Sequence, residues 1–511
     1  MGRLFTVKSV GLGVAGALTI CALAYPNDFL VRSNFFVGNY LPVSVYGFLL
    51  LFALVLRPAL AAVSPKAAFS NGETVVAFTI MLAACGVPTS GLMRYYPNLM
   101  TGPYTRQVTN QQWQSADALK YMPDHLVPEG WYREGEAPEL DRKLTPEERE
   151  RKARAASAAC EGYSRGLISG RATIQFWETE DTHRKIPLDS WLPILKWWGP
   201  FLILFMVFVV MMMVVVHPQW SRNELLPYPV AELTAALIHT EKGRRLPDVF
   251  RNGRFWLAVG IVAGIHFVRV LHAWYPETMI NIPLEWRLTA IRNHFPDFAQ
   301  HAFRSWSIFN GRFYFAAFAF AYFIPTEVSF SLGITPFCLA FLTYFLYCSG
   351  YHFNYENLAN SGAGAYLGMT FMVLVLGRHY FWNVLRAALG VRTVTDIPPA
   401  VRTAARLFLL AYVGLIAMSV AFGLSIYMAI FVITGIGVMY LVTARIIAET
   451  GCFFIQTVWK PFDVIYGLMG GRAMGPYTIS LLGVISNLFC WDPRETVSAF
   501  FINGLKICER E

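Results

Sequence analysis

Long apolar runs separated by polar stretches dominate the hydropathy pattern of the chain. A helix needs about 20 residues to cross the roughly 30 Å of bilayer hydrocarbon. Runs near that length are predicted to span a membrane at residues 9–24, 40–56, 74–93, 192–216, 255–271, 364–377, 407–424 and 427–447. The longer run 312–350, which is interrupted near Pro325, is interpreted as two passes, and residues 452–490 as a short re-entrant or interfacial pair. We therefore expect an all-α integral membrane protein with about 10–12 transmembrane or re-entrant helices.

The stretch between residues 94 and 190 is much more polar than the runs on either side, and it is predicted to be one large extracytoplasmic insertion. Within it, Thr145 and Glu148 have the spacing of a capping box, which begins a solvated surface helix. The chain then divides into N-terminal membrane helices at 1–93, an interfacial or soluble extracytoplasmic segment at 94–190, and a main membrane domain with broken helices at 191–511.

The composition supports this class of protein. The chain is 55% hydrophobic and only 15% charged, which is not the composition of an ordinary soluble protein. Its net charge of +9 comes from Lys and Arg that are spread between the apolar runs, so we expect no nucleic-acid partner and interpret the excess as a positive-inside signal. The eight cysteines show no CxxC spacing, so neither a zinc site nor a disulfide framework follows, and no cofactor is expected.

The first apolar run determines the expected orientation. Arg3 and Lys8 precede it, which favours a cytoplasmic N-terminus in a multi-pass protein of the bacterial inner membrane. The run is read as an uncleaved helix, although Ala22 to Ala24 also offer a signal-peptide cleavage site. Either reading leaves the chain on the outer side at Tyr25.

The stretch 217–254 organises the rest of the chain, because it directly follows the long apolar run 192–216. It carries six Lys or Arg residues, which is typical of a cytoplasmic loop. Pro227 and Pro229 stop the preceding helix, and Pro229 suits the first turn of a new one over residues 229–240. This short helix is expected to lie on the membrane or dip into it.

The same stretch resembles a known family. The resemblance rests on an L-x-Y-P-x-x-x-x-T-A-x-L-I pattern, formed by Leu226, Tyr228, Pro229, Thr234, Ala235, Leu237 and Ile238. This pattern resembles the oligopeptide transporter superfamily, particularly its metal-chelate branch. The whole chain is similar to an uncharacterised family of bacterial polytopic membrane proteins related to that superfamily. In that family we expect further membrane segments, so the chain is expected to be short or truncated.

The resemblance implies a secondary transporter of peptides, modified peptides or metal chelates, with proton coupling. The chain departs from the superfamily in two ways: it has no N-P-G element and no clear internal repeat. We predict that the substrate path is lined by Tyr228, Glu232, Glu327, Asn357 and Asn360. Glu327 follows the break at Pro325 and is the predicted coupling acid, because an acid at membrane depth is usually kept for an ion or substrate. A turn at the membrane face would instead leave it in water.

Two charged pairs on apolar runs have helical spacing. His266 and Arg269 are three residues apart and are expected to share one helix face. One interpretation gives them a redox or metal-binding role. The other is that their side chains extend to the membrane interface. Arg445 and Glu449 are four residues apart, so we expect a local ion pair that stabilises one helix.

Two alternatives to a transporter stay open. A membrane-embedded transferase would use His125 or His183 with carboxylates, although no acid/base motif is visible. A structural or electron-transfer subunit of a larger complex would use haem ligands among His266, His272, His352 and His379. A non-enzymatic transporter is the prediction, with membrane lipids and a small-molecule or peptide substrate as partners. Both a homo-oligomer and a membrane complex are compatible with the sequence.

Overall fold

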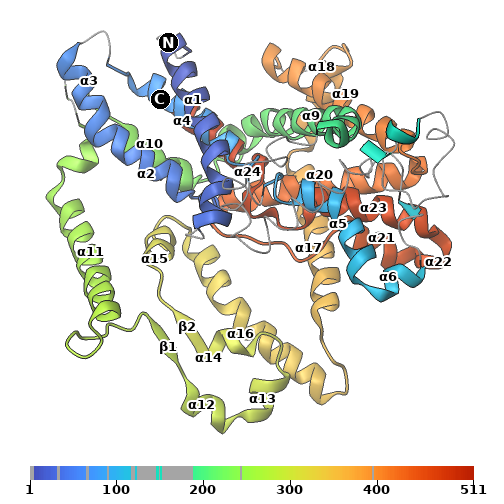
Figure 1. The fold of residues 1–511 in the computed structure, drawn as a ribbon. Helices are drawn as coiled ribbons and strands as arrows, with labels where there is room; N and C mark the ends of the chain where they lie inside the picture. Colours follow the sequence, from blue (N-terminus) through green and yellow to red (C-terminus); the bar gives the residue numbers. More distant parts are fainter. Residues whose placement is uncertain are drawn as a thin grey trace.

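The computed structural model describes residues 5–31, 35–64, 68–88, 91–116, 121–122, 145–148, 150–151, 188–241, 244, 246–393 and 396–510. Helices dominate this part of the chain (Figure 1). Its only regular strands are two of three residues each, so the all-α prediction is confirmed for the described residues. Eight helices there are long and apolar enough to cross a membrane.

The N-terminal part is a layer of helices on one side of the body. It contains α1 (Val7–Tyr25), α2 (Val43–Leu51), α3 (Arg57–Val63), α4 (Asn71–Ala84), α5 (Tyr95–Thr109) and α6 (Gln111–Ala116). The π-helical turn η2 (Phe52–Leu56) joins α2 and α3 into one membrane-length helix. Helix α1 packs along α4, and α4 packs in turn on the C-terminal helix. The predicted spans 9–24 and 40–56 therefore both form helices.

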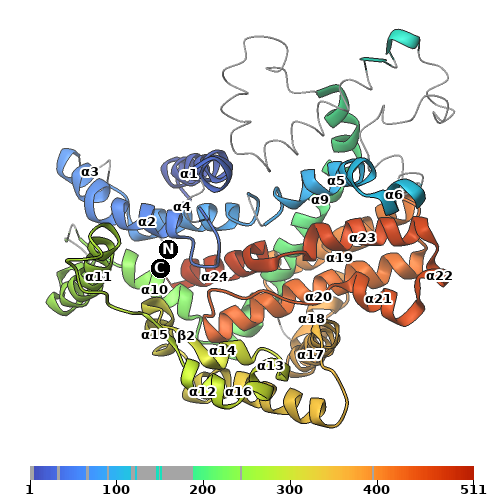
Figure 2. The same ribbon diagram turned by 60° about the horizontal axis from the view of Figure 1, so that its bottom comes forward.

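The body is formed by helices from the middle and the end of the chain. They are α9 (Leu188–Pro218), α10 (Pro229–Ile238), α19 (Pro399–Ala421), α20 (Ile426–Thr450), α21 (Pro461–Met469), α22 (Gly471–Met474), α23 (Pro476–Cys490) and α24 (Val497–Arg510). Figure 2 shows α20 beside α23 and α24, with α9 and α19 packed against them. Helix α20 is apolar around most of its circumference, and it is accordingly the most buried of the membrane-length helices. Stacked rings of Phe205 and Phe489, 3.8 Å apart, join α9 to α23.

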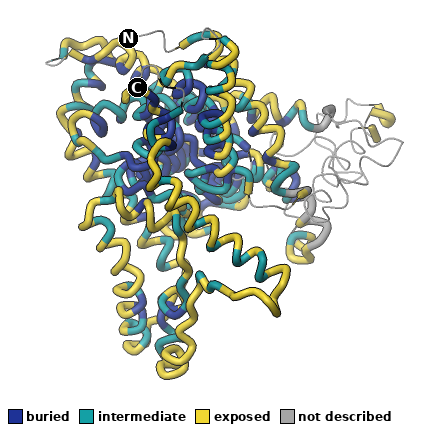
Figure 3. The backbone as a smooth tube through the Cα atoms, turned by 90° about the vertical axis from the view of Figure 1, so that its left-hand side faces the viewer, coloured by how far each residue is buried: buried dark blue, intermediate teal, exposed yellow. Residues whose placement is uncertain are grey.

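An arm formed by residues 253–376 extends away from this body (Figure 1). Its elements are α11 (Gly253–Trp274), β1 (Glu285–Arg287), α12 (Thr289–His294), α13 (Pro296–His301), α14 (Ser305–Phe309), β2 (Asn310–Arg312), α15 (Phe315–Ala321), α16 (Thr326–Cys348) and α17 (Tyr355–Leu376). Helix α18 (Arg378–Ala388) then returns the chain to α19. Figure 3 shows the buried backbone gathered in the body and exposed backbone along the arm. Large apolar side chains cover the exposed faces of α11, α16 and α17, which fits a membrane protein.

The structure differs from the predicted spans at two places. The run 74–93 forms only the 14-residue helix α4 before the chain turns. The predicted two passes within 312–350 are wrong, because α15 has seven residues and only α16, with 23, is long enough to cross. Pro325 explains the second difference, since it caps the start of α16 and cannot continue a preceding helix.

The predicted insertion 94–190 lies mostly outside the described residues. Its described part includes α5, α6 and the start of the predicted surface helix. There the Glu148 backbone N–H donates to the Thr145 hydroxyl, and the Thr145 N–H donates to the Glu148 carboxylate at 3.0 Å. The predicted capping box is confirmed.

Gly86, just after the end of α4, marks a close contact with α24. A Cβ atom at this position would lie 2.2 Å from Cγ2 of Val497 and 2.9 Å from the Val497 Cα, so the first turn of α24 can only pack here against glycine. We expect Gly86→Ala to lower the free energy of unfolding by about 1 to 3 kcal/mol through overpacking. Denaturant unfolding of the purified protein in detergent measures this. Gly199→Ala on α9 is the control, because nothing lies within 4 Å of its Cβ position, and it should leave stability equal or slightly higher.

Candidate functional site

The site is built around the break between α9 and α10. Helix α9 ends in a π-helical turn, η5 (Gln219–Asn223), and two non-glycine residues then adopt left-handed backbone, Leu225 with φ of 55° and Tyr228 with φ of 46°. The Tyr228 N–H donates to the Ala448 carbonyl of α20 at 2.9 Å, which fixes this backbone against the body. Strained backbone of this kind persists only where its surroundings hold it, and it gathers at functional sites.

Arg445 lies at the centre of the site. Its side chain on α20 is only 5% exposed. The guanidinium is ion-paired with Glu224, which follows η5, and donates from Nε to Glu449 at 3.0 Å. It also lies over the Trp220 ring, with its carbon 5.4 Å from the ring centroid. The predicted pair of Arg445 and Glu449 is therefore confirmed, but Glu224, from a distant part of the chain, makes it a three-residue network.

Two amide side chains of η5 hold Glu224 in place. Gln219 donates from Nε2 to Oε1 of Glu224 at 3.0 Å, and Asn223 donates to Oε1 of Gln219 at 2.6 Å. Buried ion pairs are expensive to form and need such additional hydrogen bonds. The π-helical turn thus positions a carboxylate toward α20.

A second set of charges comes from the C-terminal helix. Glu509 of α24 accepts hydrogen bonds from the Ser221 hydroxyl and from Nε of Arg222, the latter at 2.8 Å. Nε2 of His217 lies 3.2 Å from the same carboxylate. Burial raises the pKa of Glu509, but these two hydrogen bonds and the nearby charges outweigh burial and lower it to about 2. Glu509 is therefore ionised at neutral pH.

Lys506 connects the two sets of charges. Its Nζ donates to the Ser221 hydroxyl at 2.6 Å and lies 3.6 Å from the Glu509 carboxylate. The same Nζ lies over the Tyr228 ring, 5.6 Å from its centroid. We call the whole assembly the charge cluster, which comprises His217, Trp220, Ser221, Glu224, Tyr228, Arg445, Glu449, Lys506 and Glu509.

Three polar atoms of the charge cluster are buried without a hydrogen-bond partner among the described residues. They are Nδ1 of His217, Nε1 of Trp220 and the hydroxyl of Tyr228. Both Trp220 and Tyr228 are fully buried, and the His217 and Tyr228 rings are 6.2 Å apart. Each such group costs about 1 to 3 kcal/mol when it stays unsatisfied. Such an atom is a candidate donor or acceptor for a polar ligand.

The structure separates the five residues predicted to line a path. Tyr228 belongs to the charge cluster, and Glu232 lies at its edge, where it pairs with Arg510. Glu327 lies instead in the first turn of α16 on the arm, with its carboxylate exposed and unpaired among the described residues. Asn357 and Asn360 lie in the first turns of α17, beyond the other end of α16. Helix α16 has 23 residues and is therefore roughly 34 Å long, so Glu327 is remote from the two asparagines.

The histidines considered as metal or haem ligands do not gather. Among the described residues, no group of three or more metal-ligating side chains occurs. His266 packs against Phe315, whereas Nδ1 of His272 is hydrogen-bonded to the Met279 carbonyl at 2.8 Å. His352 packs against a tyrosine ring, and His379 contacts its neighbour Arg378. His125 and His183, the residues proposed for a transferase, lie outside the described residues.

Sequence reasoning missed most of the charge cluster. Glu224, Lys506 and Glu509 each also contact a residue more than 200 positions away along the chain, and such contacts leave no local signal. One signal was available: Arg445 lies near the end of a largely apolar helix, and a buried cation needs carboxylate partners.

Fold and site together define the class: a helical protein with eight membrane-length helices among the described residues and a charge cluster where two of them, α9 and α20, meet α24. The chain belongs to a protein family of unknown function, DUF6785, whose family model matches residues 2–511. No curated protein and no solved structure matches the chain.

Proposed function

We propose that this protein is a secondary transporter of the bacterial inner membrane that moves peptides or related small solutes, coupled to protons. The observation that carries the proposal is Arg445, a cation buried on a membrane-length helix and held by a carboxylate from a broken second helix. Ionisable side chains at membrane depth mark ion and substrate pathways. In secondary transporters such sites form where membrane helices are interrupted. The orientation with a cytoplasmic N-terminus, taken from the positive-inside pattern, is part of the proposal.

The charge cluster offers a way to couple a proton to a solute. Arg445 balances Glu224 and Glu449 when both are ionised. A proton that binds Glu224 neutralises its carboxylate. Arg445 can then form an ion pair with the carboxylate of a peptide instead. The unpaired hydroxyl of Tyr228 is a donor for the same carboxylate. Release of the solute lets Arg445 pair with Glu224 again, and the proton leaves.

Uptake by proteoliposomes tests this proposal. We expect a labelled pool of dipeptides and tripeptides to accumulate under an inward proton gradient with the parent protein. Glu224→Gln should lower this accumulation at least tenfold, because it removes the proton-binding carboxylate, while peptide exchange without a gradient persists.

Glu327→Gln is the matched variant, since it makes the same chemical change on the exposed start of α16. If only Glu327→Gln loses accumulation, the coupling acid is the one predicted from the sequence. If neither variant changes accumulation, the coupling role of both acids is contradicted.

A further inference from the structure

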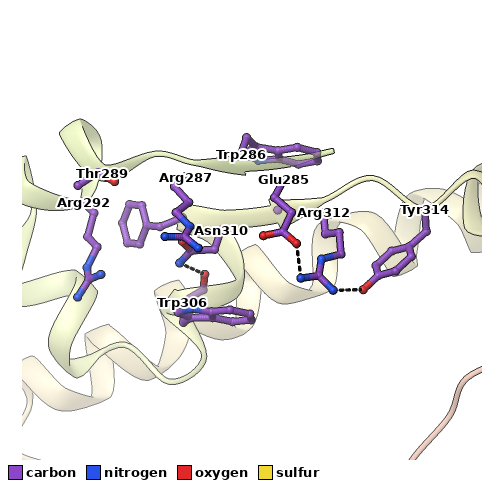
Figure 4. A pocket seen from close by; sticks show the side chains of 11 residues that line it. Glu285, Trp286, Arg287, Thr289, Arg292, Trp306, Asn310, Arg312 and Tyr314 are labelled. Atoms are coloured by element: carbon purple, nitrogen blue, oxygen red, sulfur yellow. Dashed lines mark hydrogen bonds and ion pairs between the residues drawn. The ribbon is translucent and has the colours of Figure 1, made fainter. Parts of the chain in front are cut away.

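The arm carries two neighbouring pockets at its two-stranded sheet. In this sheet Glu285 is opposite Arg312, Trp286 is opposite Gly311, and Arg287 is opposite Asn310. The larger pocket, of about 760 Å³, lies between the sheet, α12 and α14 (Figure 4). The smaller one, of about 380 Å³, lies between the sheet and α11. Both include Glu285, Arg312 and Tyr314, so the two pockets adjoin at these residues, and we call them together the groove.

Positive charge is in excess along this groove. Its charged lining consists of Arg269, Arg287, Arg292 and Arg312, together with His266 and a single acid, Glu285. Glu285 is ion-paired with Arg312, which also donates to the Tyr314 hydroxyl at 3.3 Å. The guanidinium groups of Arg287 and Arg292 have no hydrogen-bond or ion-pair partner among the described residues. Two cations are therefore available to an anion.

Two indole rings lie near these cations. Figure 4 shows Trp306 below the strands with Arg287 and Arg292, whereas Trp286, the neighbour of Arg287 in β1, lies over the strands on the other side. The Trp286 ring packs so closely on β2 that a Cβ at Gly311 would lie 2.0 Å from it, so only glycine fits opposite this ring. The Asn310 amide donates to the Trp306 carbonyl at 3.0 Å and holds α14 against the sheet.

The groove lies at the level of one end of a membrane-length helix. His266 and Arg269 lie in the C-terminal half of α11, and Trp274, at its end, is 75% exposed. Trp306 is 71% exposed. Exposed tryptophans at the ends of membrane helices are typical of the bilayer interface, where the headgroups of lipids lie. Basic pockets between membrane helices bind lipid headgroups of negative charge.

We propose that this groove binds the phosphate of an anionic phospholipid, with Arg287 and Arg292 as its ligands and Trp306 beside the glycerol. The site is separate from the charge cluster, and the inference does not depend on transport.

Thermal unfolding of the purified parent in a neutral detergent tests the proposal. It is titrated in parallel with short-chain phosphatidylglycerol, short-chain phosphatidylcholine and inorganic phosphate. A ligand that binds only the folded protein raises the melting temperature with concentration. We expect phosphatidylglycerol to stabilise the parent and the other two to have little effect at the same concentration. The double variant Arg287→Gln, Arg292→Gln should bind phosphatidylglycerol roughly thirtyfold more weakly, because each arginine near an anionic lipid surface contributes roughly a fivefold factor.

The matched control is Arg251→Gln, Arg254→Gln, which removes two exposed arginines at the other end of α11. It should bind phosphatidylglycerol as the parent does. Equal weakening by both double variants would show a general charge effect and overturn the site. Stabilisation by inorganic phosphate equal to that by phosphatidylglycerol would overturn the lipid assignment in favour of a free anion. Both double variants should melt at the parent's temperature without lipid, since they replace exposed side chains.

Discussion

Replacing Arg445 with glutamine is expected to lower the free energy of unfolding by about 3 to 5 kcal/mol, since a buried ion pair that loses one partner leaves an uncompensated charge. Glu224, whose side chain is 14% exposed, would remain without its cation. We also expect uptake of the peptide pool to be lost. Denaturant unfolding in detergent and uptake by proteoliposomes measure the two effects.

Arg402→Gln on the neighbouring helix α19 is the control. That side chain is exposed, so its replacement should change the free energy of unfolding little. The double variant Glu224→Gln, Arg445→Gln should recover part of the lost stability, since it removes both charges together. Strictly additive effects of the two single substitutions would contradict the pairing of Glu224 with Arg445.

Substitution of Tyr228 is the second change with a large expected effect. Whether it lowers or raises the stability of the fold depends on the residue that replaces the tyrosine. Tyr228→Ala removes a fully buried ring and should lower the free energy of unfolding by about 3 to 5 kcal/mol. Tyr228→Phe keeps the ring and removes only a hydroxyl that has no partner among the described residues, so stability should rise by about 1 kcal/mol. Uptake should nevertheless fall about fivefold, because the hydroxyl is the group that we propose binds the solute.

Tyr380→Phe provides the comparison for this prediction. The Tyr380 hydroxyl on α18 donates to the Val215 carbonyl at 2.9 Å, so its removal should lower stability by about 1 kcal/mol and leave uptake unchanged. If Tyr228→Phe also lowers stability, its hydroxyl has a partner within the protein. If it leaves uptake unchanged, the hydroxyl does not contact the solute.

Most of the membrane-length helices in the described part of the chain could be predicted from the sequence. Continuous apolar runs produced α9, α19 and α20, and local signals located the break at Pro229 and the cap at Thr145. The pair of Arg445 and Glu449 was predictable for the same reason, because residues four apart share a helix face. All of these features depend on nearby residues alone.

The charge cluster could not be predicted in this way. Glu224, Arg445 and Glu509 come together only because α24 packs against α9, α10 and α20, and nothing in the local pattern specifies that packing. Glu327 is placed by a different local signal, and its predicted coupling role stays a prediction. The sequence places an acid beside an apolar run, but Pro325 starts α16 immediately before it, and the carboxylate lies in an exposed first turn. Local hydrophobicity predicts where a helix forms more reliably than it predicts what surrounds a charged side chain.

The measurement that tests the transporter proposal most directly is proton entry driven by solute. Proteoliposomes that contain the parent protein and a trapped pH-sensitive dye are mixed with the peptide pool or with peptide–metal chelates, with no gradient imposed. The account predicts acidification of the lumen with at least one solute and none with Arg445→Gln. If no solute across the whole panel acidifies the lumen of vesicles containing folded parent protein, proton-coupled transport by this chain is contradicted.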